Sequence, residues 1–285
     1  RQDGRMDFFD TGREMTSPHT SGRLYGELSW EELRNMSTDL TEEERRAPHA
    51  LYYGQPMAEV QAEHKKAMES KALAPHQCVM PGELGASLFG GSLGSPENGY
   101  GVLDNGVGYA AVRIDQNGIT DEMIRKYREE FAHEGSLFYK TWFPGTHLIH
   151  YLDGAAEDFG WGFCNMKFSR DEFEFSHLGI TKEDIPRLDP DCINLIGVNA
   201  LATDIMHPEQ GPDYMAMVCY TRLSAGGREL RIRYWNGLRF EAAGKVVLKV
   251  RHTRDVMEQR MNMMMSHCMR EYCNELRLIK AFWNT

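Results

Sequence analysis

Two residues near the C-terminus have the types and spacing to bind a metal ion. His267 and Glu271 are four positions apart in a stretch without Gly or Pro, so on a helix both project from one face. A histidine and a carboxylate at that spacing can chelate one divalent cation. Met264 and Leu278 share this side, so we expect a buried face, where an unpaired carboxylate is costly. The alternative is an exposed His–Glu pair, worth roughly a few tenths of a kcal/mol.

Two further histidines flank an apolar pair in the middle of the chain. The segments 137–143 and 146–152 are rich in aromatic and β-branched residues, which favours strands. His147 and His150 differ by three, so in a regular strand they face opposite sides. At most one of them is then expected to share a cavity with the helix. A single histidine on a strand is more often structural than a ligand.

An acidic strand is predicted at 172–178. Glu172 and Glu174 share one face, while His177 and two phenylalanines share the other. Alternation of this kind usually places the acids in water on a half-exposed strand. A ligand role for Glu174 or His177 is therefore the less common interpretation of the pattern alone.

A basic strand is predicted at 228–236. Arg231 and Arg233 lie on one side and Tyr234 on the other, where its hydroxyl could reach into a cavity. Buried tyrosine hydroxyls normally find hydrogen-bond partners. The alternative is a sheet with an exposed basic face.

The order of the predicted elements indicates an α+β fold. Helices are predicted at 121–134 and at 253–280, the second capped by Thr253. The clearest hairpin pairs 214–223 with 228–236. Antiparallel strands followed by one long helix are typical of a sheet that curls around the helix and leaves a cavity. Other strands are expected at 101–103, 108–114, 137–143, 146–152, 160–168, 172–178, 192–200 and 244–251.

The N-terminal third differs in pattern from the rest. Helix starts are predicted at Ser29 and Thr41, and another helix within 56–72. A segment rich in Gly and Ser follows, without the spacing of a phosphate-binding loop. We therefore expect a helical arm and loop at 1–95 and the main domain at 96–285.

Composition excludes several classes of function. The chain has 285 residues, 41% hydrophobic residues and a net charge of −10, which suits a soluble domain but not a nucleic-acid binder. No apolar run approaches a membrane span, and no signal peptide is visible. The six cysteines are scattered without a CxxC pair. We expect a protein of the reducing cytoplasm with no membrane partner.

Five features follow one another in order over roughly residues 80–280: the segments 96–106, 118–124, 139–147 and 227–237, and the His267/Glu271 pair. Taken together, they resemble the diacetylphloroglucinol hydrolase and phloretin hydrolase family. The resemblance implies a Bet v1-like helix-grip fold, in which a curved antiparallel sheet surrounds a long C-terminal helix, with a helical N-terminal part.

The same resemblance implies a divalent metal, usually zinc, held by two histidines and two glutamates. Fe²⁺ or another divalent ion is compatible with such ligands. The remaining glutamate is expected from the strand after the first histidine; Glu174 is our prediction, and Glu172 or His177 are the alternatives. The other three ligands implied by the motifs are His147, His267 and Glu271.

Residues that would contact the substrate are also implied by the resemblance. Tyr139 and Tyr234 match family tyrosines that contact phenol groups. The chain departs from relatives at His150, where they carry Asn, and at Cys219, where they carry a further His; His207 is nearby in sequence. The candidate catalytic residues are therefore Tyr139, Tyr234, His150 and His207.

The resemblance implies hydrolysis of the carbon–carbon bond between an acyl group and a polyphenolic ring, releasing a carboxylic acid and the phenol. The partner would be a small acylated phenol, and a homodimer is expected. One alternative is a helix-grip protein that binds phenolic or apolar ligands without chemistry. A second is an iron-dependent oxygenase, because mixed His and carboxylate ligation also suits iron.

Overall fold

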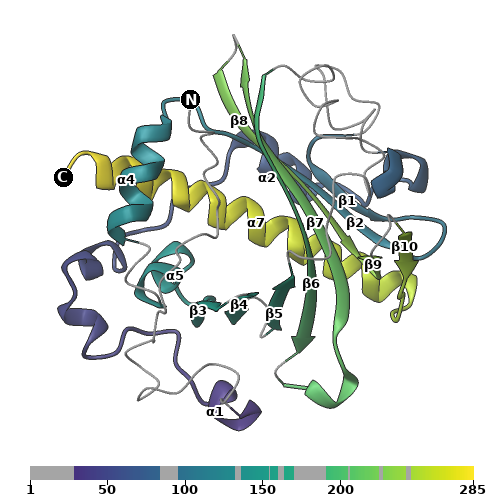
Figure 1. Cartoon of the computed structure of the whole chain (residues 1–285). Coiled ribbons are helices and arrows are strands. Elements are labelled where there is room, and N and C mark those ends of the chain that lie inside the picture. Colours follow the sequence, from purple (N-terminus) through teal and green to yellow (C-terminus); the bar gives the residue numbers. More distant parts are fainter. Residues whose placement is uncertain are drawn as a thin grey trace.

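A long C-terminal helix and an eight-stranded sheet form the centre of the protein in the computed structural model (Figure 1). The structure describes residues 29–83, 96–131, 136–153, 155–159, 164–169, 191–204, 206–224, 227–241 and 245–285. The predicted strand at 172–178, with Glu172, Glu174 and His177, lies outside these residues.

The sheet is antiparallel throughout and has the order β1-β2-β8-β7-β6-β5-β4-β3. The hairpin predicted from 214–223 and 228–236 is confirmed, with Ser224 paired to Gly227. A short separate ribbon, β9 (Leu238–Glu241) with β10 (Lys245–Leu248), follows β8. The sheet strands are β1 (Gly99–Val102), β2 (Gly108–Asp115), β3 (Ile149–Asp153), β4 (Ala155–Phe159), β5 (Cys164–Ser169), β6 (Cys192–Asp204), β7 (Asp213–Ser224) and β8 (Gly227–Asn236).

Helix α7 (Arg254–Trp283) runs across one face of this sheet, as Figure 1 shows in yellow. Its methionines pack on apolar side chains of β1, β2, β7 and β8, because flexible thioether side chains fill an irregular interface well. The predicted long helix and antiparallel strands are therefore present, while the name helix-grip stays a prediction. No helix in the described ranges is long and apolar enough to cross a membrane.

Two helices gather toward the C-terminal end of α7: α4 (Asp121–Phe131) and α5 (Ser136–Trp142) (Figure 1). The prediction of a strand at 137–143 is wrong, because this segment forms α5. Its aromatic residues favour a strand in isolation, but Leu137 and Phe138 are buried in a cluster with Phe131 and Phe282. Tertiary packing overrides the local preference here.

The N-terminal arm consists of short helices packed against the rest of the chain. Ser29 caps the first with a reciprocal bond to Glu32, as its sequence predicts. The helix predicted within 56–72 forms only over Ala62–Glu69. The boundary between the arm and the main domain at residue 95 stays a prediction. Its helices are α1 (Trp30–Arg34), η3 (Glu44–Arg46), η4 (Pro48–Tyr52), α2 (Ala62–Glu69), η5 (Pro75–Gln77) and η6 (Pro81–Glu83).

The face of the sheet away from α7 is also buried. Arg231 is 5% exposed and Arg233 is fully buried, so the alternative of an exposed basic face is wrong. Arg231 contacts Glu229 at 2.6 Å, and Arg233 lies 3.4 Å from Glu97. Acidic partners therefore make burial of these arginines tolerable.

A buried ion pair joins the arm to α5. The Nζ atom of Lys140 lies 3.0 Å from a carboxylate oxygen of Glu44, and both side chains are 3% exposed. Lys140 also donates to the carbonyl of Asp39 at 2.8 Å. Removing one member of such a pair leaves the other charge buried without its partner.

We predict that Lys140→Met lowers the free energy of unfolding by about 3 to 5 kcal/mol, because Glu44 loses its buried counter-charge. Urea unfolding measures this. The double variant Lys140→Met/Glu44→Leu should recover much of the loss. Arg125→Ala, which breaks the exposed pair Arg125–Glu129, should change stability by less than about 0.5 kcal/mol. Equal losses in the single and double variants would contradict the pairing argument.

Candidate metal centre

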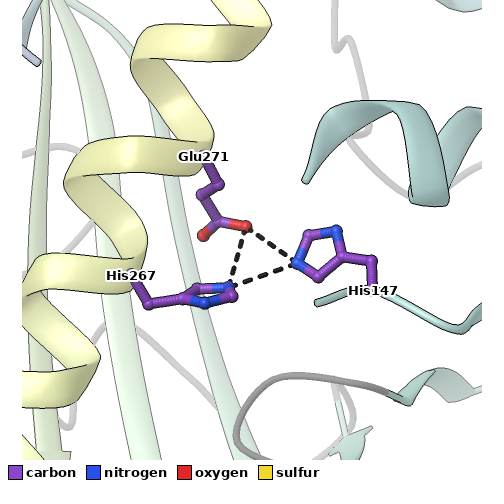
Figure 2. A group of neighbouring side chains, drawn as sticks. All are labelled: His147, His267 and Glu271. Carbon is purple, nitrogen blue, oxygen red and sulfur yellow. Dashed lines mark hydrogen bonds and ion pairs between the residues drawn. The ribbon is translucent and has the colours of Figure 1, made fainter. Parts of the chain in front are cut away.

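Three side chains from two distant parts of the chain meet beside α7 (Figure 2). His267 and Glu271 project from α7 one turn apart, which confirms the prediction that they share a helix face. His147 comes from the segment between α5 and β3 and points toward them. Their side chains are 9%, 10% and 1% exposed respectively, so the group is largely shielded from water.

The spacing of the three ligand atoms fits a metal ion. The Nε2 atoms of His147 and His267 are 3.2 Å apart, and each lies 3.4 Å from Oε2 of Glu271. In a tetrahedral zinc site, bonds of about 2.0 to 2.1 Å separate the ligand atoms by roughly 3.3 Å. The donor set therefore fits zinc, and its mixed nitrogen and oxygen ligands also suit Fe²⁺.

The tautomer of His147 is determined by its other ring nitrogen. Nδ1 lies 3.0 Å from the backbone carbonyl of Tyr139, which can only accept a hydrogen bond. Nδ1 therefore carries a proton, and Nε2 is the ring nitrogen that faces His267 and Glu271. This arrangement is the one that a metal-binding histidine requires.

Burial and charge set the protonation states of the α7 pair. Burial lowers the pKa of His267 to about 4, against the opposing effect of Glu271. Burial raises the pKa of Glu271, but attraction to His267 and hydrogen bonds from both histidines outweigh it and lower the pKa to about 2. At neutral pH the carboxylate is ionised beside a neutral His267. The ionised carboxylate attracts a cation.

Aromatic rings from the α5 region enclose the two imidazoles. The ring of Tyr139 stacks on His147 with centroids 3.7 Å apart, and Trp142 meets the same imidazole edge-on at 5.7 Å. The ring centroid of Phe143 lies 4.7 Å from that of His267. This enclosure limits water around the ligands, which strengthens their electrostatic interaction with an ion.

Tyr234 lies in the same core as α7, on the side opposite to Arg231 and Arg233, as the strand pattern predicts. Its hydroxyl oxygen accepts a hydrogen bond from the thiol of Cys268 at 3.2 Å, and Cys268 follows His267 directly. Burial raises the pKa of Tyr234 well above its ordinary value of 10.0. The hydroxyl therefore stays protonated and able to donate.

The remaining sequence-based candidates lie at separate places in the fold. The prediction that His147 lies on a strand is wrong, because it precedes β3. The argument that His147 and His150 face opposite sides of one strand therefore does not apply. His150 lies on β3 opposite Asp158. His207 is exposed, with Nδ1 3.4 Å from Glu209, and is outside the three-residue group. Cys219 lies on β7 in the core, where burial raises its pKa to about 12.

Two residues that fix the site geometry are absent from the sequence-based candidates. The indole Nε1 of Trp142 donates to the backbone carbonyl of Glu271 at 2.9 Å. The fully buried side chain of Asn274 donates to the carbonyls of Thr141 and Trp142. The only signal in the sequence is a polar amide at Asn274, three residues after Glu271 on the buried helix face.

An antiparallel sheet, a long helix and a shielded His–His–Glu group define a protein with a candidate metal-binding catalytic centre. Comparison with known families matches the one described as "DAPG hydrolase PhiG domain" at residues 87–165 and 177–280, more than half of the chain. The chain belongs to this family, which confirms the resemblance seen in its motifs. It is also 30% identical over 124 residues to a phloretin hydrolase of Eubacterium ramulus, covering 42% of this chain and 45% of that relative.

We predict that the purified protein holds about one zinc or iron ion per chain, and that His147→Ala, His267→Ala and Glu271→Gln each lose it. Each variant removes one of three donors or the negative charge that attracts the cation. Elemental analysis after gel filtration measures this, with circular dichroism to establish folding. His76→Ala, at an exposed histidine, should keep the wild-type metal content. Retention of metal by all three site variants would contradict the assignment.

Proposed function

We propose that this protein is a metal-dependent hydrolase that cleaves the carbon–carbon bond between an acyl group and a polyphenolic ring. Water is the second substrate: the acyl carbon gains the hydroxyl group and the ring carbon gains the proton. The observation that carries the proposal is the His147–His267–Glu271 group, with its ionised carboxylate, in a chain of this family. The match spans only 45% of the phloretin hydrolase, so the reaction itself is part of the proposal.

The metal would be held by His147, His267 and Glu271, with zinc as the expected ion. Glu174 is proposed as the fourth ligand on the strength of the family resemblance; it lies outside the described residues. A divalent ion bound there supplies Lewis acidity toward a carbonyl oxygen and toward water.

Protonation of the ring carbon is the first chemical difficulty. A polyphenol can shift to a keto tautomer, in which the ring carbon that bears the acyl group has accepted a proton. Hydrogen bonds to the phenolic oxygens stabilise this tautomer. Tyr234 suits this task because its buried hydroxyl stays protonated at neutral pH. Tyr139 is proposed as the second phenol contact, since its ring lies directly against His147.

The surroundings of the group suit a reaction that consumes a single water. Trp142 and Phe143 lie against the imidazoles, and the three ligand side chains are at most 10% exposed. A low-dielectric site strengthens the hydrogen bonds that tyrosine hydroxyls make to developing phenolate charge. The substrate is accordingly proposed as a small acylated phenol. A homodimer and a cytoplasmic location stay predictions.

We predict that incubation of the metal-loaded protein with phloretin or an acylphloroglucinol releases the free phenol and the carboxylic acid. Mass spectrometry in H₂¹⁸O should find the label in the acid, and in D₂O deuterium should enter the ring. Tight binding without turnover would replace the proposal with a non-catalytic binder. Oxygen consumption with iron bound would replace it with an oxygenase.

We predict that Tyr234→Phe lowers kcat by roughly 10²-fold or more while metal content and fold stay unchanged, because the variant loses one hydroxyl donor. Steady-state kinetics with metal analysis measures this. Tyr220→Phe is the matched control, because Tyr220 lies on β7 and faces the other side of the sheet, and it should keep wild-type kcat. Equal activity of Tyr234→Phe and wild type would remove Tyr234 from the mechanism.

A further inference from the structure

Asn274 sits at a junction of three parts of the chain. Its side chain is fully buried on α7, three residues beyond Glu271. The amide nitrogen donates to the carbonyls of Thr141 and Trp142, at 3.3 and 2.8 Å, where α5 ends. The amide oxygen accepts from the backbone N–H of Ala58 at 3.2 Å and from Nε of Arg277 at 2.8 Å.

These four partners determine the orientation of the amide. Carbonyl oxygens only accept, and the N–H groups of Ala58 and Arg277 only donate, so the Asn274 amide has one orientation that satisfies all four. Aspartate lacks the two donors, and leucine lacks every polar atom. The position therefore requires a short side chain that donates twice and accepts twice.

The carbonyls that Asn274 holds belong to the segment that delivers His147. The last carbonyls of a helix have no partner within the helix and need one from outside. Beyond that end, the backbone N–H of Phe143 bonds to Tyr139, and that of His147 bonds to Phe143 at 3.1 Å. The Tyr139 carbonyl then orients the His147 ring. A hydrogen-bonded path thus runs from the helix end to the ligand.

A second contact between α5 and α7 supports the first. Trp142 donates from its indole to the backbone carbonyl of Glu271, itself one of the three clustered residues. Asn274 and Trp142 together bind the end of α5 to the helix turn that carries Glu271. The Lys140–Glu44 ion pair also holds α5, but to the N-terminal arm rather than to α7.

We propose that Asn274 is a positioning residue that sets the distance between His147 and the His267/Glu271 pair, and thereby the affinity of the centre for a divalent cation. The inference extends the proposed function, on which its metal-binding part rests. Asn274 touches none of the three ligand atoms; it acts through the backbone of α5. Loss of its two donors frees the α5 end, so the ligands spend less time at metal-binding distance.

The test compares Asn274→Asp with the wild type by competition for zinc against a chromophoric chelator. Aspartate keeps the size and the accepting oxygen but loses both donors. We expect roughly 10- to 100-fold weaker zinc affinity, the range for loss of a residue that orients a metal ligand. Trp142→Phe, which keeps the ring but loses the indole donor, should weaken affinity in the same direction. Wild-type affinity in both variants would overturn the proposal.

Asn199 provides the matched control. It is another buried asparagine whose amide bridges two segments, donating to the carbonyl of Phe240 at 2.9 Å and accepting from its N–H at 3.0 Å. Asn199→Asp should destabilise the protein in urea comparably while leaving zinc affinity unchanged. A similar fall in zinc affinity in this variant would mean that the effect reports stability rather than positioning.

Hydrogen exchange of the metal-free protein gives a second readout. We expect the backbone amides of Phe143, Thr146 and His147 to exchange at least tenfold faster in Asn274→Asp than in the wild type, and at the wild-type rate in Asn199→Asp. Unchanged exchange in Asn274→Asp would overturn the positioning role. This test does not depend on zinc binding, because the protein is metal-free. Normal zinc affinity with no turnover of acylphenols would instead contradict the proposed function and leave this inference standing.

Discussion

An ionised carboxylate buried between two imidazoles is the constraint around which this protein is organised. Desolvation opposes the charge on Glu271, yet the pKa of that carboxyl is held at about 2 by His267 and His147. Burying such a charge is costly unless opposite charge or hydrogen bonds compensate. The imidazole of His267 is neutral at neutral pH, since burial keeps its pKa near 4. An ionised carboxylate and two imidazole nitrogens at this spacing are ligands that a divalent cation prefers, which is the physical reason that the cluster fits a cation.

The scaffold holds this group in place with apolar packing on one side and backbone hydrogen bonds on the other. Met261 and Met265 belong to the core that seats α7 on the sheet, so the helix cannot rotate to expose Glu271. On the other side, Trp142 and Asn274 tie α5 to α7. His147 is 120 residues from His267 in sequence, so without such ties the two halves of the centre would be free to separate.

Local sequence patterns predicted the parts of this structure that depend on local periodicity. The four-residue spacing of His267 and Glu271 and the hairpin around Ser224 are examples, because helix and strand periods act within one segment. Helix α5 was missed because its aromatic residues favour strands until packing against Phe131 and Phe282 decides otherwise. The burial of Arg233 depends on which residues cover the sheet, and no local pattern encodes this. The role of Asn274 likewise depends on a carbonyl group 132 residues away in sequence.

The composition of the buried group also bears on the choice between an enzyme and a simple binding protein. A cavity that only holds an apolar or phenolic ligand gains nothing from an ionised carboxylate beside two imidazoles. Apolar residues of similar volume at such positions are often neutral or stabilising. In this chain the group is instead supported by a tautomer-fixing carbonyl, an enclosing set of aromatic rings and a fully hydrogen-bonded asparagine. Support of this kind fixes the positions of the three side chains relative to one another, which is expected where the geometry serves metal binding.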